Sequence, residues 1–159
     1  MAAECILANV SMSFTESPVM VLNSVVDSWQ LQNIWIDLDP NNCTKNTTAQ
    51  FQTCSDTQIS QLNGYGDDFL VDLARSGATS RAGNGYFIEQ CLEHVGPNSA
   101  GWLAYETQGV KLYAAVDSWW GSIDQGARDP AAEHAYTPDC ALQLHDGGAA
   151  VQCNPSCFT

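Results

Sequence analysis

The sequence predicts an α/β fold in which parallel strands alternate with flanking helices. Two short apolar runs, residues 19–26 and 86–92, are bounded by turn-forming residues, and the first is rich in β-branched side chains. Such runs are typical of strands that are buried on both faces of a parallel sheet. Residues 55–77, between them, have helical spacing. A helix that joins two strands forms a crossover, so we expect the strands to be parallel neighbours.

The size and charge of the chain limit what it can be. It has 159 residues, 45% of them hydrophobic, which suits one domain or part of one with a packed core. Its 18 acidic and 5 basic residues give a net charge of −13. Nucleic acid and anionic membranes bind clustered cations, so neither is an expected partner. No run of roughly 18 apolar residues is present, so we expect no membrane span.

The first strand leads directly to an acid. Residues 19–26 form the strand, and Asp27 follows at its carboxyl end. Leu31 and Ile34, three residues apart, predict a short helix over residues 28–36. Asp27 therefore has two candidate roles. It either caps this helix or carries chemistry at the sheet edge where α/β proteins place their sites.

A polar loop and a capped helix come next. Cys43 and Cys54 bracket the polar part of the loop at residues 37–53, and we expect them to be bonded. Closing this loop would stabilise the fold by about 3 kcal/mol. Ser55 and Gln58 have the spacing of a capping box, which predicts that a helix begins here.

The predicted helix is amphipathic. Its apolar residues are Ile59, Leu62, Phe69, Leu70 and Leu73. Arg75 and Gly77 mark its end. Gly64 and Gly66 each cost up to about 1 kcal/mol relative to alanine, so they predict a weak point where the helix could kink.

The second strand, residues 86–92, is followed by His94 and by a turn at residues 96–98. A second amphipathic helix is predicted over residues 110–120, ending at Gly121. Its apolar stripe consists of Leu112, Tyr113, Val116, Trp119 and Trp120. We expect the two tryptophans to lie in the core. The rest of the chain is rich in Ala, Gly and Asp, and we expect it to form a tail that disulfide bonds hold in place.

Cysteine usage predicts an oxidising compartment. The seven cysteines are Cys5, Cys43, Cys54, Cys91, Cys140, Cys153 and Cys157. No C-x-x-C pair occurs, so disulfides explain the count better than zinc does. Metal binding is also disfavoured because His94, His134 and His145 include no pair at helical ligand spacing. We therefore predict no metal and no cofactor.

Three glycosylation sequons, at Asn9, Asn42 and Asn46, agree with secretion. The first five residues have neither the cationic nor the apolar region of a secretory signal. We therefore expect a secreted or cell-wall protein whose signal peptide lies in a missing N-terminal part.

Asp27 and His94 together predict an acid–base pair. Both follow predicted strands, and adjacent parallel strands would bring them to one sheet edge. The chain order is strand, acid, helix, strand, histidine. This order matches the part of a Ser…Asp…His hydrolase that follows its serine. In such a triad the acid orients the imidazole, which takes the proton of the nucleophile. The sequence contains no G-x-S-x-G elbow. Trp29 either lines a substrate pocket or packs at the strand end.

Three stretches carry a resemblance to a known family. Residues 21–34 contain Asn-Ser-x-x-Asp-Ser-Trp-Gln, residues 85–94 contain Cys-x-x-His, and residues 153–157 are Cys-Asn-Pro-Ser-Cys. In content and order they resemble the pectin acetylesterase family, which includes the Notum carboxylesterases. The resemblance implies an α/β-hydrolase-like fold and a serine carboxylesterase mechanism, with Asp27 as triad acid and His94 as base.

The same resemblance implies that residues 1–159 are the C-terminal portion of a single domain. The family's serine elbow would precede Met1, and Cys5 would pair with a cysteine of that missing half. Plant members have a cysteine directly after the histidine, where this chain has Val95. The implied substrate is an acetylated, pectin-like polysaccharide, and the implied complete enzyme is a monomer. Without its nucleophile the chain alone is expected to be inactive, so its status as an enzyme stays open.

Two other hypotheses remain. The chain could be a non-catalytic, disulfide-rich secreted glycoprotein derived from the same family, or an acidic disulfide domain unrelated to esterases. A piece of a larger sheet exposes an unpaired edge and should aggregate, whereas a free-standing glycoprotein should melt cooperatively as a monomer.

Overall fold

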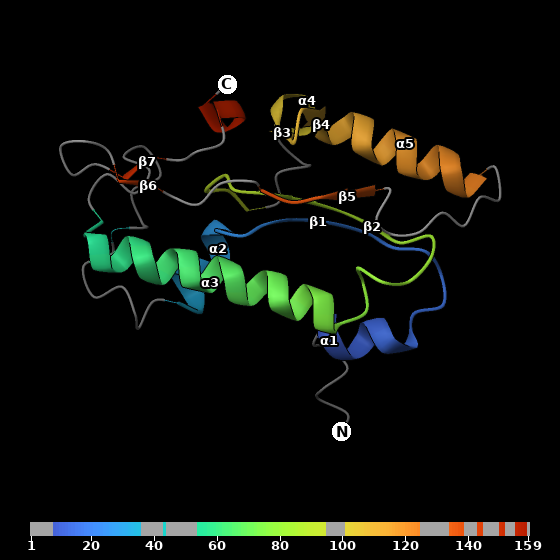
Figure 1. Cartoon of the computed structure of the whole chain (residues 1–159), viewed down its shortest axis with the longest axis horizontal. Helices are drawn as coiled ribbons and strands as arrows, with labels where there is room; N and C mark the ends of the chain where they lie inside the picture. Colours follow the sequence, from blue (N-terminus) through green and yellow to red (C-terminus); the bar gives the residue numbers. More distant parts are fainter. Residues whose placement is uncertain are drawn as a thin grey trace.

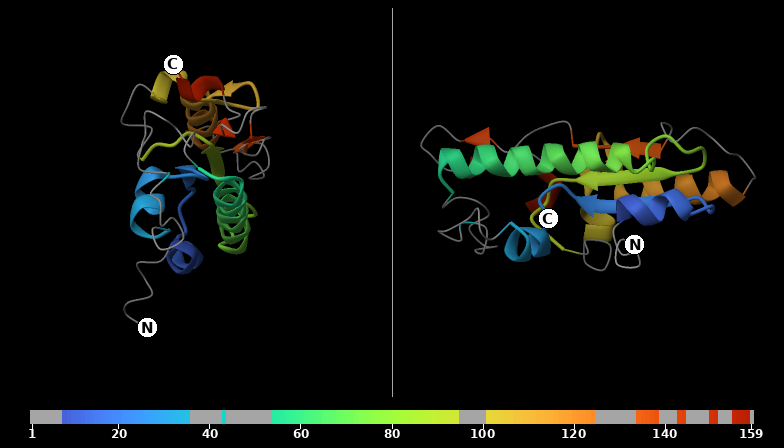
Figure 2. Two further views of the ribbon diagram at one scale, coloured as in Figure 1. Left: turned by 90° about the vertical axis from the view of Figure 1, so that its left-hand side faces the viewer. Right: turned by 90° about the horizontal axis from the view of Figure 1, so that it is seen from below.

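In the computed structural model, a short parallel sheet lies between two layers of helices (Figure 1, Figure 2). The structure describes residues 8–35, 43, 54–94, 101–124, 134–138, 143–144, 150–151 and 155–158. Strands β1 (Met20–Ser24), β2 (Gly85–Glu89) and β5 (Ala135–Tyr136) form the sheet in the order β1-β2-β5. β1 and β2 are parallel, with Ser24 opposite Glu89 at their carboxyl ends. The predicted pairing of the first two strands is therefore confirmed.

The crossover from β1 to β2 contains both α2 (Ser28–Asn33) and α3 (Asp56–Arg75). The two helices lie on the same face of the sheet, with α1 (Ala8–Ser11) and the 3-10 turn η2 (Met12–Phe14) beside the far end of α3 (Figure 1). The predicted capping box is present, because Ser55 and Gln58 exchange both of its hydrogen bonds. The helix runs without interruption through both of its glycines.

Gly66 has a packing role that explains its place in a helix. A Cβ atom built at Gly66 would lie 3.3 Å from Cβ of Val25, which is a tight contact. The missing side chain lets α3 approach the chain immediately after β1. Close approach at this point compensates for the low helix propensity of glycine.

The opposite face is covered by α5 (Leu112–Asp124), and here two predictions are wrong. The helix begins two residues later than Val110, because β3 (Glu106–Thr107) and β4 (Val110–Lys111) form a hairpin. Its turn, Gln108-Gly109, has positive φ at both residues, as a type I′ hairpin turn requires. The helix also continues through Gly121 to Asp124 instead of ending there.

The prediction that both tryptophans of α5 are core residues is half wrong. Trp119 is buried and its Nε1 donates to the carbonyl of Gly83 at 2.8 Å, whereas Trp120 is 63% exposed. Successive helix residues point about 100° apart, so only one of two adjacent side chains can face the sheet. Tyr113, at the other end of the predicted stripe, is also exposed.

Each strand divides its side chains between two hydrophobic clusters. Val21 and Ile88 pack toward α2 and α3, while Leu22 and Phe87 pack toward α5. This alternation follows from the two-residue period of a strand. Buried residues of the α3-side cluster are Val25, Val26, Leu31, Trp35, Cys43, Cys54, Ile59, Leu62 and Ile88. Those of the α5-side cluster are Phe87, Cys91, Tyr105, Leu112 and Ala115.

Short elements complete the described chain. They are α4 (Gly101–Ala104), the antiparallel pair β6 (Gln143–Leu144) and β7 (Ala150–Val151), and the 3-10 turn η6 (Pro155–Phe158). The third sheet strand, β5, was not predicted, because two paired residues leave no periodic signal. No helix among the described residues is long and apolar enough to cross a bilayer.

Two disulfides are present among the residues that the structure describes. Cys43–Cys54 confirms the predicted bond across the polar loop, and Cys91–Cys157 ties the end of β2 to η6. Cys5, Cys140, Cys153, His145 and the sequon residues Asn42 and Asn46 lie outside the described residues. Asn9 lies in α1, and its side chain is likewise outside them. Most of the predicted loop 37–53 and the turn at 96–98 also fall outside.

Candidate functional site

Asp27 follows β1 and is the N-cap of α2. Its Oδ1 accepts a hydrogen bond from the backbone N–H of Gln30 at 2.8 Å. The N-cap residue has a non-helical backbone conformation, which lets its side chain accept a hydrogen bond from a backbone N–H in the first turn of the helix. The carboxylate is only 3% exposed. Because the helix cap uses Oδ1, the second oxygen, Oδ2, remains available for another hydrogen bond.

The second oxygen of Asp27 contacts His94. Oδ2 lies 2.8 Å from Nδ1 of the imidazole, whose side chain is 48% exposed. Both candidate roles of Asp27 are thus compatible, since capping uses Oδ1 and the histidine uses Oδ2. With an ionised carboxylate at this distance, Nδ1 carries the proton and Nε2 has the lone pair.

Backbone pairing beyond the strands brings the histidine to the acid. At the last residue of β2, Val25 N donates to Glu89 O at 3.0 Å, and beyond the strand Ser28 N donates to Glu93 O at 3.1 Å. The segment after β2 therefore runs alongside the turn between β1 and α2. His94, one residue beyond the last of these bonds, lies directly beside Asp27.

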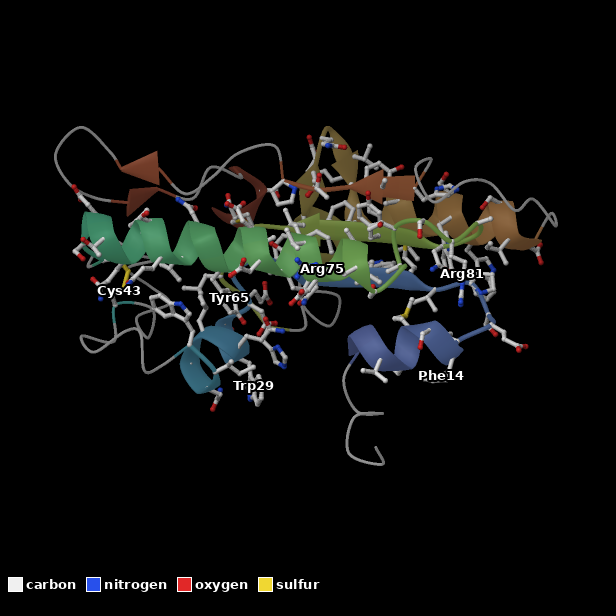
Figure 3. The ribbon with its side chains drawn as sticks, turned by 60° about the horizontal axis from the view of Figure 1, so that its bottom comes forward. Phe14, Trp29, Cys43, Tyr65, Arg75 and Arg81 are labelled. Atoms are coloured by element: carbon white, nitrogen blue, oxygen red, sulfur yellow. A yellow bond between two sulfur atoms is a disulfide. The ribbon has the colours of Figure 1, made fainter. Side chains whose placement is uncertain are left out.

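Trp29 lies next to the histidine. Its ring is stacked on that of His94, with centroids 6.0 Å apart and planes inclined by 29°. The side chain projects from α2 at the surface and is 51% exposed (Figure 3). Trp29 therefore flanks the exposed imidazole and is not a buried packing residue at the strand end.

Tyr65, on α3, was not identified from the sequence. Its hydroxyl donates to Oε1 of Gln30 at 3.0 Å, between α3 and α2 (Figure 3). Burial, and secondly the negative charge of Asp27, raise the pKa of the Tyr65 phenol. It therefore remains a hydrogen-bond donor and supports the first turn of α2. Its position three residues after Leu62, on the apolar stripe of the helix, was the available signal.

Two further groups bear on the chemistry. Ser24, the only serine in β1, is buried and donates its hydroxyl to Cys91 O at 2.7 Å, so it is held as a structural group. Among the described residues, Glu89, Cys91 and Cys157 have possible ligand atoms within 4.8 Å of one another. The two sulfurs are bonded to each other, so this group offers no thiolate and does not fit a metal ion.

The fold and the site define a class of protein. A parallel sheet with flanking helices, and an acid and a histidine after adjacent strands, correspond to an α/β-hydrolase-like fold. The chain belongs to the pectinacetylesterase family, whose model matches residues 1–157.

Curated relatives agree with this membership. The chain is 30% identical over 113 residues to pectin acetylesterase 11 of Arabidopsis thaliana, covering 66% of this chain and 28% of that protein. It is 23% identical over 142 residues to palmitoleoyl-protein carboxylesterase notum2 of Xenopus laevis, covering 89% and 25% respectively. The chain thus spans about a quarter of the length of these relatives. No solved structure gives a significant match.

Proposed function

We propose that this chain supplies the acid and the base of a carboxylic ester hydrolase, with Asp27 orienting His94. The observation that carries the proposal is the 2.8 Å contact between a buried carboxylate and a half-exposed imidazole. In the proposed arrangement, residues 1–159 are the C-terminal portion of the family domain. The nucleophilic serine belongs to a part of that domain that this sequence does not contain.

The proposed mechanism follows from the two nitrogens of His94. Asp27 holds the proton on Nδ1, so Nε2 accepts the serine proton as the hydroxyl attacks the ester carbonyl. The resulting imidazolium is stabilised by the carboxylate and returns its proton to the leaving alcohol. A water molecule then repeats the cycle on the acyl-enzyme, with Nε2 again acting first as base and then as acid. Asp27 stays ionised throughout.

The proposed substrate is an acetyl ester of a pectin-like polysaccharide. Two of the relatives are named pectin acetylesterases, and a third is named a palmitoleoyl-protein carboxylesterase. All three names describe an enzyme that hydrolyses an ester. Trp29 supports a carbohydrate substrate, because an exposed indole beside the base can stack on a sugar ring.

The proposed setting is secreted or cell-wall. The Cys43–Cys54 and Cys91–Cys157 disulfides support an oxidising compartment. The proposed chemistry needs no cofactor, since a triad completes both proton transfers with side chains and water. We propose that the complete enzyme acts as a monomer.

A chimera tests the proposal. In it, this chain replaces the matching segment of pectin acetylesterase 11 and restores a complete domain. We expect hydrolysis of p-nitrophenyl acetate and of acetylated pectin. Asp27→Asn should lower kcat by about 10⁴-fold because the imidazole loses its orienting partner. His94→Ala should lower it by about 10⁶-fold.

The matched control is Asp68→Asn, at an exposed acid of α3, which should leave kcat unchanged. If either Asp27→Asn or His94→Ala retained the activity of the control, that residue would lose its proposed role. The isolated chain gives a second readout in nitrogen NMR spectra of its histidines. Neutral His94 should be protonated at Nδ1, and Asp27→Asn should redistribute the proton toward Nε2.

A further inference from the structure

A groove on the α5 face takes no part in the chemistry proposed above. It lies between α4 and α5, opens to solvent and has a volume of about 330 Å³. Both helices lie on the side of the sheet opposite to α2 and α3 (Figure 1), whereas Trp29, which stacks on His94, belongs to α2. The side chains that line this aromatic groove are Trp102, Tyr113, Val116, Asp117 and Trp120.

The helix period explains how α5 can face the core and the groove at once. From Tyr113 to Trp120 its lining residues recur at intervals of three or four, which places them on one face of the helix. Leu112 and Trp119, each one residue earlier, are buried against the sheet. Successive residues point about 100° apart, so α5 has two adjacent apolar faces. The core uses only one of them.

The aromatic rings of the groove are accessible and yet fixed by packing. Trp120 is 63% exposed and Tyr113 is 43% exposed, while Trp102 is half-buried and packs against the α5-side cluster. The ring of Trp120 packs against that of Trp119, with centroids 6.0 Å apart and planes inclined by 61°. Trp119 is itself held by its hydrogen bond to Gly83 O. A ligand would therefore meet rings that are already ordered, which lowers the entropic cost of binding.

The lining combines aromatic faces with a single charged group. Indole and phenol rings offer broad apolar surfaces for contact. Asp117 is exposed, and its carboxylate can only accept hydrogen bonds. A ligand that fits must present an apolar face to the rings and a hydrogen-bond donor at its edge. A sugar ring has this form, because its C–H groups make a face and its hydroxyls project from the rim.

Charge decides which sugars are complementary to the groove. The net charge of −13, and Asp117 within the lining, repel an anion. Lys111, directly before α5, is paired with Glu106 at 3.2 Å and so does not offset Asp117. A galacturonate residue carries a free carboxylate, whereas its methyl ester is uncharged. The groove therefore suits esterified sugar residues and disfavours unesterified ones.

We propose that the aromatic groove is a carbohydrate-binding site for uncharged, methyl-esterified galacturonate residues of a pectin-like chain. The choice of this polysaccharide rests on the function proposed above. The aromatic rings contact the C–H faces of the sugars, and Asp117 accepts a hydrogen bond from a sugar hydroxyl. The site retains the protein on esterified stretches of polysaccharide and releases stretches whose carboxyl groups are free.

NMR titration of the 159-residue chain with methyl-esterified trigalacturonide tests the site. The indole N–H signals of Trp102 and Trp120 should shift. The signal of Trp119 should stay, because its indole is buried and bonded to Gly83 O. Unesterified trigalacturonide should bind about fivefold more weakly at low salt, because its carboxylates approach Asp117. High salt should reduce this difference by screening the charges.

Three variants sharpen the titration. Trp120→Ala should weaken binding of the esterified sugar by about three- to tenfold, because one aromatic face is lost. Asp117→Asn keeps an acceptor and removes the charge, so it should retain the esterified sugar and bind the unesterified one more tightly than the unaltered chain does. Ser118→Ala, at an exposed position of α5 outside the lining, is the matched control and should leave both affinities unchanged.

Two results with the unaltered chain would overturn the proposal. One is that the signals of Trp102 and Trp120 do not move, and the other is equal affinity for the two trigalacturonides at low salt. Tetramethylammonium tests the other chemistry that aromatic rings beside a carboxylate can bind. A stronger response to this cation than to the esterified sugar would contradict the carbohydrate assignment.

The chimera described above supplies the last arm. Binding that persists there, and that Trp120→Ala weakens, supports the site in a complete domain. Loss of binding in the chimera would mean that the rest of the domain covers the groove, and the proposal would fail. None of these readouts depends on ester hydrolysis. An inactive chimera that still binds the sugar through Trp120 would therefore count against the proposed function alone.

Discussion

The two faces of the sheet are built from very different spans of sequence. The α3 face uses residues of the β1–β2 crossover, and its disulfide joins cysteines 11 residues apart. The α5 face combines β1, β2, the hairpin, α5 and η6, and its disulfide joins cysteines 66 residues apart. Both faces cover the same two strands, so the comparison separates local from long-range sources of stability.

The comparison also shows which parts of the fold position Asp27 and His94. Asp27 is held by the α3 face, through its cap on α2 and through Tyr65 and Gln30. His94 follows Cys91, which is bonded to η6 on the α5 face. The pair therefore forms where the two faces meet, and loosening either face should displace one partner from the other.

The largest expected effect comes from removing the buried tryptophan of α5. Trp119→Ala deletes a buried indole and its hydrogen bond to Gly83, so we expect a loss of about 3–5 kcal/mol in unfolding free energy. Trp120→Ala is the control on the next residue of the same helix and should change stability by less than about 0.5 kcal/mol. Urea unfolding measures both. Equal losses would mean that α5 has a different orientation.

The disulfides give the next largest effect and compare the faces directly. In the chain-entropy model, replacing Cys91 and Cys157 with serine should cost about 4 kcal/mol, against about 3 kcal/mol for Cys43 and Cys54. The longer loop costs more because its closure restricts the unfolded chain more strongly. Thermal and urea unfolding of the two double variants measure the difference. The reverse order would show that the local loop contributes native contacts beyond its entropy.

The smallest effect belongs to the cap of α3. Ser55→Ala removes the side chain that accepts from Gln58 N, so we expect a loss of about 1 kcal/mol. Ser60→Ala, at an exposed position one turn further along the helix, is the matched control and should be neutral or slightly stabilising. An equally neutral Ser55→Ala would indicate that tertiary packing alone sets the start of α3.

Much of the α3 face could be predicted from the sequence because its signals are local. The capping box at Ser55, the apolar period of α3 and the short loop between Cys43 and Cys54 each lie within a few turns of chain. The meeting of Asp27 and His94 also follows from one inference, that consecutive strands around a helical crossover are parallel neighbours. The catalytic role of the pair remains a prediction.

The α5 face could not be predicted in the same way, because its partners are far apart in the sequence. The pairing of Cys91 with Cys157 is one of many that seven cysteines allow, and β5 is too short for a periodic signal. The burial of Trp119 but not Trp120 depends on how α5 is rotated against the sheet.

By itself, the sequence determined the first two strands of the sheet, the capped crossover helix between them, and the acid and histidine that follow these strands, because hydrophobic period and capping act over short distances. Only the tertiary structure decided that Asp27 serves both as a helix cap and as the partner of His94. The tertiary structure also decided the pKa of Glu89, which burial raises to about 8. The charge state of a buried acid depends on the groups that folding gathers around it, here Ser24, Cys91, Glu93 and Asp27.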